Sequence, residues 1–121
     1  MKNTNIELLA PAGSWEALEA AVNAGANAVY LGGKAFGARA YASNFDREEL
    51  ARAVQFTHMH RVRLYVTVNT LVDDREMEEL VDYLLFLNRV GVDGIIVQDL
   101  GVIRVAHALV PEPPWIISNI V

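Results

Sequence analysis

IELLAPAGSWEALEAAVNAGANAVYLGG, residues 6–33, is typical of a strand, a helix and a second strand in direct succession. We expect the first strand over Ile6–Ala10, which is apolar and is followed by a proline. Ser14 stands where a helix N-cap is favoured, and Gly25 stands where a helix end is favoured. The second strand is then Ala28–Leu31. Two apolar strands joined by one amphipathic helix predict a parallel βαβ unit with a right-handed crossover.

The rest of the chain repeats this pattern. Asp46 with Glu49, and Asp73 with Glu76, have the spacing of a capping box at a helix start. Further strands are expected over Arg63–Asn69, Gly94–Gln98 and Trp115–Ile117. Without a linker or low-complexity segment, residues 1–121 should form one α/β domain of parallel βα repeats. A complete barrel needs about 250 residues, so we expect the N-terminal half of a TIM-like (β/α) barrel, although a doubly wound sheet has a similar element order.

The composition excludes several classes of protein. Of the 121 residues, 53% are hydrophobic, which is enough for a packed core. The net charge of −5 and the lack of a basic patch in the sequence argue against a DNA-binding module. The chain has no cysteine, so its residues can form no disulfide, zinc–thiolate site or cysteine nucleophile. No apolar run approaches the roughly 20 residues that span a bilayer, and we expect a cytoplasmic protein with no membrane partner.

Ligands of parallel α/β folds bind where the strands end, so polar and glycine residues there are candidates for a substrate site. Gly32 and Gly33 allow a ligand to approach the backbone closely, and Lys34 and Arg39 offer positive charge for an anion. The alternative for this segment is a tight turn without a ligand. The segment Gly32–Lys34 lacks the residue spacing of a phosphate-binding P-loop.

Three further polar residues follow the third and fourth expected strands. Asn69 and Thr70 either hydrogen-bond a substrate or cap the following turn. Asp99 is either a general base or the N-cap of the next helix, and no second carboxylate is placed beside it by spacing. The three histidines are expected to be structural, because His58 and His60 are two apart and point in different directions on a helix. We therefore predict no metal site.

Three segments carry a resemblance to a known family: ELLAPAGSWEALEAAVNAGANAVYLGGKAFGARAYASNF (7–45), VRLYVTVNTLV (62–72) and GVDGIIVQDLG (91–101). Together they resemble the start of the collagenase-like bacterial peptidases of family U32. The resemblance implies a barrel-like catalytic domain in a much longer protein. Members of the family are commonly described as proteases. Others are linked to oxygen-independent hydroxylation of RNA bases (the tRNA wobble uridine or a ribosomal cytidine) or of a quinone ring, with an iron–sulfur cluster.

The resemblance implies that strand-end residues line a pocket: Pro11, Gly32, Gly33, Arg39, Asn69, Thr70 and Asp99. The cysteine-bearing signature of the family lies beyond the part that this chain resembles. We therefore expect no cofactor on this chain, and an iron–sulfur cluster only in a longer parent protein. The chain departs from the family at Ser118 and Asn119, where a threonine and a glutamine are usual.

Three functions follow from these expectations. The chain is the N-terminal barrel segment of a peptidase, part of an RNA-base hydroxylase acting on tRNA or rRNA, or a non-catalytic scaffold. The substrate of the parent would be a peptide or an RNA, and the isolated chain should have no peptidase activity. A half barrel would leave Leu9, Val29, Tyr65, Val66 and Ile96 in water, which predicts a homo-oligomer. The competing outcome is an open sheet with helices on both faces.

Overall fold

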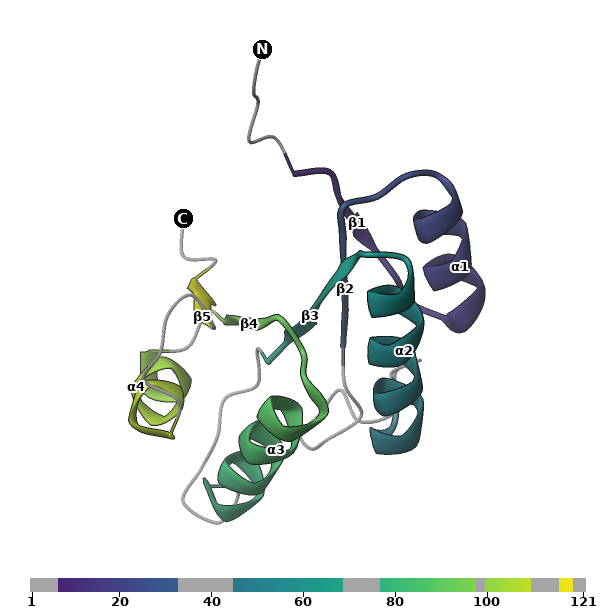
Figure 1. Cartoon of the computed structure of the whole chain (residues 1–121). Helices are drawn as coiled ribbons and strands as arrows, with labels where there is room; N and C mark the ends of the chain where they lie inside the picture. The colour runs from purple at the N-terminus through teal and green to yellow at the C-terminus, as the bar shows by residue number, and fades with distance from the viewer. Residues whose placement is uncertain (1–6, 33–44, 69–76, 98–99, 110–115, 119–121) are drawn as a thin grey trace.

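The computed structural model describes residues 7–32, 45–68, 77–97, 100–109 and 116–118. In these ranges, parallel strands alternate with helices, as the sequence predicts (Figure 1). The elements are β1 (Leu9–Pro11), α1 (Trp15–Asn23), β2 (Ala28–Gly32), α2 (Arg47–Met59), β3 (Arg63–Thr67), α3 (Met77–Val90), β4 (Gly94–Val97), α4 (Leu100–Leu109) and β5 (Ile116–Ser118).

The strands form one sheet in the order β1-β2-β3-β4-β5, and every neighbouring pair is parallel. This confirms the predicted fold class. The register places Tyr30 of β2 beside Tyr65 of β3, and Gly32 beside Thr67. Because all described strands run the same way, their carboxyl ends meet at one edge of the sheet.

The described helices pack against one face of this sheet, as Figure 1 shows. The strand side chains in this main core are Val29, Leu31, Leu64, Val66, Ile95 and Val97. The prediction that Val29 and Val66 line the opposite, inner face is therefore wrong. Side chains alternate along a strand, so Val66 and its neighbour Tyr65 must point to opposite faces. The alternative with helices on both faces does not describe this part of the chain.

The other face of the sheet carries a second, smaller cluster, formed by Ala28, Tyr65 and Ile96 with the partly buried Tyr30 against it. We call this side, against which none of the described helices packs, the helix-free face. Tyr65 and Ile96 expose only 7% and 8% of their surface. Of the five residues expected to stand in water, only Leu9 does so, with 42% exposed.

The helix starts follow the predicted capping chemistry. The Ser14 hydroxyl accepts a hydrogen bond from the Ala17 backbone N–H at 3.1 Å. At α2, the Asp46 carboxylate accepts from the Glu49 backbone N–H at 2.8 Å, and the Glu49 carboxylate accepts from the Asp46 N–H at 3.0 Å. This confirms the capping box. The second predicted box, at Asp73 and Glu76, lies outside the described residues.

The element boundaries differ from the prediction at the first strand. β1 begins at Leu9 and includes Pro11, which we expected to end it. Proline is tolerated in β1 because, among the described strands, β1 lies at the edge of the sheet and one side of it needs no N–H donor.

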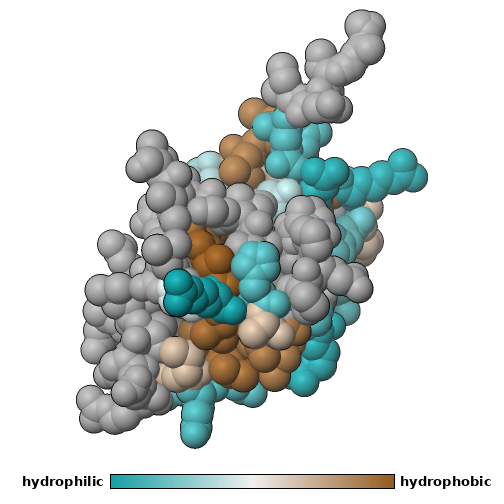
Figure 2. All heavy atoms as spheres, turned by 90° about the vertical axis from the view of Figure 1, so that its left-hand side faces the viewer, coloured by the Kyte–Doolittle hydropathy of each residue, from teal (hydrophilic) through white to brown (hydrophobic). Residues whose placement is uncertain are grey.

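The side of the molecule formed by α4 and β5 shows apolar side chains gathered among hydrophilic ones (Figure 2). Ile103, Val105 and Leu109 of α4 are only partly buried. Among the described helices, none combines the length and the apolar character needed to cross a bilayer.

Candidate functional site

The carboxyl edge of the sheet is where a parallel α/β fold places its ligand. Gly32 ends β2 directly beside Thr67, which ends β3, and Thr67 lies in register with Ile96 of β4. The Thr67 hydroxyl donates a hydrogen bond to the Leu31 carbonyl at 3.4 Å. Glycine at position 32 presents no side chain beside Thr67, and its carbonyl accepts a hydrogen bond from the Phe45 backbone N–H at 3.1 Å.

One step further from this edge, two tyrosines stand side by side on the helix-free face. Tyr30 and Tyr65 are register partners on neighbouring strands, and both belong to the small cluster on this face. Gly94 of β4 lies in register with Tyr65, so no side chain flanks the ring on that strand. Aromatic rings of this kind bind planar apolar or aromatic groups.

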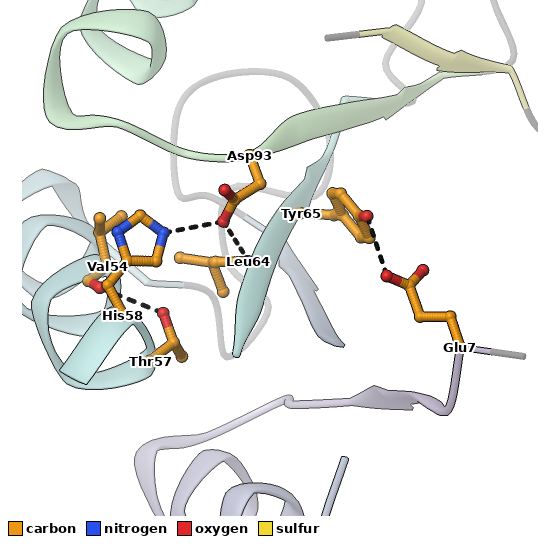
Figure 3. A network of polar contacts seen from close by, with 7 residues as sticks. All are labelled: Glu7, Val54, Thr57, His58, Leu64, Tyr65 and Asp93. Carbon is orange, nitrogen blue, oxygen red and sulfur yellow. Dashed lines mark hydrogen bonds and ion pairs between the residues drawn. The ribbon is translucent and has the colours of Figure 1, made fainter. Parts of the chain in front are cut away.

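The opposite end of the same face carries charge (Figure 3). The Glu7 carboxylate accepts a hydrogen bond from the Arg63 guanidinium at 2.6 Å and a longer one from the Tyr65 hydroxyl at 3.4 Å. Partial burial raises the pKa of Tyr65, while the neighbouring Arg63 opposes this rise. The Tyr65 hydroxyl is therefore neutral at pH 7 and is directed toward the start of the chain.

A second polar contact lies where β3 and β4 begin, away from the carboxyl edge (Figure 3). The Asp93 carboxylate accepts from the Leu64 backbone N–H at 2.8 Å and lies 2.8 Å from His58 Nε2. His60 Nδ1 lies 2.9 Å from the Phe56 carbonyl. These contacts join helix to strand and helix to itself, which gives both histidines structural partners.

Of the predicted substrate residues, the structure places Gly32, at the end of β2. Pro11, which the family resemblance added, ends β1 in register with Tyr30. The others lie outside the described residues: Gly33, Lys34, Arg39, Asn69, Thr70 and Asp99.

Tyr30 and Thr67 were not among the predicted site residues. A signal for them exists in the strand sequences AVYLG and RLYVT. In both, aliphatic residues alternate with residues that are small, aromatic or polar. The period of two assigns the second set to one face, opposite the helices.

The described residues and the composition provide few ligands for a metal ion or an iron–sulfur cluster. No group of three potential metal ligands occurs within the described ranges. The whole chain contains no cysteine, so these residues do not fit a thiolate-bound iron–sulfur cluster. What they do provide is a face on which the Tyr30 ring is only partly buried, next to the Thr67 hydroxyl at the carboxyl edge.

Comparison with known proteins adds a family. The sequence model of peptidase family U32 matches residues 13–119. The chain is 43% identical over 106 residues to tRNA hydroxylation protein P1 of Bacillus subtilis. The matched region covers 88% of the chain and 25% of that protein. It is 40% identical over 99 residues to the 23S rRNA 5-hydroxycytidine C2501 synthase of Escherichia coli, covering 82% of the chain and 15% of that enzyme.

A relative with a different description is similar to the same degree. The chain is 38% identical over 104 residues to the uncharacterized protease MJ0090 of Methanocaldococcus jannaschii, covering 86% of the chain and 26% of that protein. The chain thus spans about a quarter or less of the length of these relatives.

Proposed function

Because the chain belongs to peptidase family U32, we propose that it takes part in the hydroxylation of RNA bases and that its helix-free face helps to position the base. The observation that carries this proposal is the likeness, over more than four fifths of the chain, to two proteins named for RNA hydroxylation. This favours the RNA alternative over the peptidase function that we expected first.

The chemistry of the helix-free face is compatible with this role. A pyrimidine ring is planar, and it stacks well on a tyrosine ring such as that of the partly buried Tyr30, which packs against the buried Tyr65. The Thr67 hydroxyl and the backbone next to Gly32 would lie near the edge of such a ring. We also retain the predicted Lys34, Arg39, Asn69, Thr70 and Asp99 as substrate residues at this edge. The oxidation step itself is not assigned to any residue of this chain.

The test is deletion of the gene that encodes the chain, followed by mass spectrometry of nucleosides from total tRNA and rRNA. We expect the loss of a uridine or cytidine derivative that carries one additional oxygen atom, and its return when a plasmid copy is supplied. Unchanged nucleoside profiles in both RNA fractions would contradict the proposal. Plasmid copies with Tyr30→Ala or Arg39→Ala should restore the modified nucleoside poorly, whereas Glu19→Ala on the exposed side of α1 should restore it fully.

The peptidase function remains the second candidate because of the likeness to the protease from Methanocaldococcus jannaschii. It predicts that purified protein cleaves casein or gelatin in proportion to its concentration. It further predicts that Asp99→Asn removes this cleavage. Cleavage with these properties, together with unchanged RNA nucleosides in the deletion strain, would establish it in place of the RNA function.

A further inference from the structure

The first and last turns of the described helices differ in charge, although Glu7 and Asp93 lie where the strands begin and Arg47 opens α2. In a parallel sheet each connecting helix runs back, so helix starts lie at the carboxyl edge and helix ends lie where strands begin. Acidic residues occupy the first turns of α1, α2 and α3: Glu16, Glu48, Glu49, Glu78 and Glu79. Basic residues occupy the last turns of α2, α3 and α4: His58, Arg89 and His107. We call the end with the helix C-termini the basic rim.

The segment around the end of α2 is the most basic part of this rim. Residues 50–72 contain neither aspartate nor glutamate, in a chain whose net charge is −5. The same segment contains three arginines, Arg52, Arg61 and Arg63, and two of the three histidines. His58, Met59, His60, Arg61 and Arg63 are all exposed.

Arg61 occupies a backbone position that glycine normally fills. Its φ is 59°, and it is the only described residue other than glycine with a positive φ. The equivalent positions after α1 and α3 are Gly25 and Gly91, with φ of 94° and 92°. A side chain in this left-handed region costs conformational energy that glycine avoids. The arginine is therefore not explained by the turn itself.

The neighbouring charges do not explain it either. Arg63 is paired with Glu7, and His58 is paired with Asp93, so the two nearby carboxylates have partners. Among the ion pairs within the described ranges, none involves the Arg61 guanidinium. A favourable interaction with the helix dipole would be available to a cation in the last turn, without the cost of a positive φ. The Arg61 guanidinium is thus exposed at an ordered turn, where it can bind an anion of another molecule.

We propose that the basic rim around Arg61 binds the phosphate backbone of the RNA substrate. This inference rests on the proposed function. It places a contact between protein and RNA phosphate at the end of the sheet opposite the carboxyl edge. An RNA longer than the positioned base extends beyond the carboxyl edge, where the described first turns carry Glu16, Glu48, Glu49, Glu78 and Glu79 and where Arg47 is paired with Asp82. The basic rim gives the strand a surface of the opposite sign, and Arg61 is its outward-facing guanidinium. Arginine suits this role because its planar fork binds phosphate oxygens in pairs.

The experiment measures binding of a fluorescein-labelled tRNA transcript to the 121-residue chain by anisotropy, at several salt concentrations. In Arg61→Gly the charge is lost while the backbone of the turn is favoured, so the fold should be kept or strengthened. We expect binding to weaken about five- to tenfold, and the slope of log K against log salt to fall by about 0.7–0.9, the value for one lost phosphate contact. Arg61→Lys keeps the positive charge, so the slope of log K against log salt should stay close to that of the unaltered chain. The matched control Arg104→Gln, which removes an exposed arginine from the middle of α4, should leave binding unchanged.

The outcomes separate this inference from the function on which it rests. If Arg61→Gly binds tRNA with the affinity and salt dependence of the unaltered chain, the rim contact is wrong, while base hydroxylation is still judged by the nucleoside profiles. If Arg104→Gln weakens binding as much as Arg61→Gly, the contact is not specific to this rim and the inference is again wrong. An unaltered chain that shows no salt-dependent tRNA binding also overturns it.

Discussion

At the scale of single residues, the helix ends show how one local motif is used repeatedly. After each of α1, α2 and α3, a buried residue donates its backbone N–H to the carbonyl five residues earlier: Ala26 to Ala21, Val62 to Thr57 and Val92 to Leu87. This is the long-range bond of a Schellman motif, and it requires a left-handed residue just before the buried one. Glycine supplies that conformation after α1 and α3, and Arg61 supplies it after α2.

The first prediction concerns this left-handed position. Gly25→Ala should lower the free energy of unfolding by about 1 kcal/mol, because alanine is disfavoured at positive φ. A Cβ at position 25 would meet no atom within 4 Å, so the loss is conformational and not steric. Urea unfolding followed by circular dichroism measures it. Gly13→Ala is the control, since that site is equally open and its φ lies outside the left-handed region. Equal stability of the two variants would argue against this reasoning.

The second prediction concerns pH. Burial raises the pKa of Tyr83 well above its ordinary value, and the nearby Arg47 only partly opposes this. A pKa that is higher in the folded than in the unfolded chain gives stability that is complete below the unfolded pKa and is lost as pH rises through the folded one. Stability should therefore decline above about pH 10, where tyrosine in the unfolded chain ionises. Tyr83→Phe should make that decline shallower, as urea midpoints between about pH 9 and 11 would show. An identical pH dependence in both proteins would refute this.

At the scale of elements, side chains just before a strand join the beginning of that strand to the beginning of its neighbour. Asn27, just before β2, accepts from the Leu8 backbone N–H at 2.8 Å, and Asp93, just before β4, accepts from the Leu64 N–H at the same distance. Each residue lies two positions after the left-handed glycine of its turn. Asp93 additionally contacts His58, so one carboxylate joins α2, β3 and the start of β4.

The third prediction tests this joint. Asp93→Ala should cost about 1–3 kcal/mol of unfolding free energy, because the partly buried Leu64 N–H loses its acceptor. Asp93→Asn keeps an acceptor oxygen and should recover most of that loss. His58→Ala should cost less than Asp93→Ala, since the pair is substantially exposed and its members are 42% and 31% accessible. Chemical denaturation of the three variants gives the order of their unfolding free energies. A larger loss of stability for His58→Ala than for Asp93→Ala would contradict the role assigned to the Asp93–Leu64 hydrogen bond.

At the scale of the whole molecule, the open edges of the sheet govern association. Among the described strands, β1 and β5 each have one neighbour, which leaves backbone groups available on the other side. Leu8 and Leu9 at the β1 edge are 55% and 42% exposed. The driving force for association is therefore smaller than a fully exposed inner face would give, and Leu8 and Leu9 place part of it near β1.

The fourth prediction is that the chain self-associates at high micromolar concentration through the β1 edge. Light scattering after size exclusion should show a mass above that of one chain. Leu9→Glu should shift the chain toward the monomer without unfolding it. Leu85→Glu is the matched control, because Leu85 is 43% exposed but lies on α3, away from the sheet edge. A monomer at all concentrations, or equal effects of both substitutions, would exclude association by this edge.

The order of the elements, their parallel direction and the caps of α1 and α2 were determined by the sequence alone. They depend on short-range chemistry: Ser14 and Asp46 bond to backbone groups three residues away, and continuous apolar strands between amphipathic helices pair only in parallel. Gly32 could be identified as a strand-end residue for the same reason.

What covers each face of the sheet was decided only by the tertiary structure. The alternation in RLYVT separates Val66 from Tyr65, but only the packed structure shows Val66 in the main core with the helices and Tyr65 in the small cluster on the other face. The basic rim has the same origin. Its residues belong to different helix ends, and the acidic composition conceals them until the parallel strands bring those ends to one side.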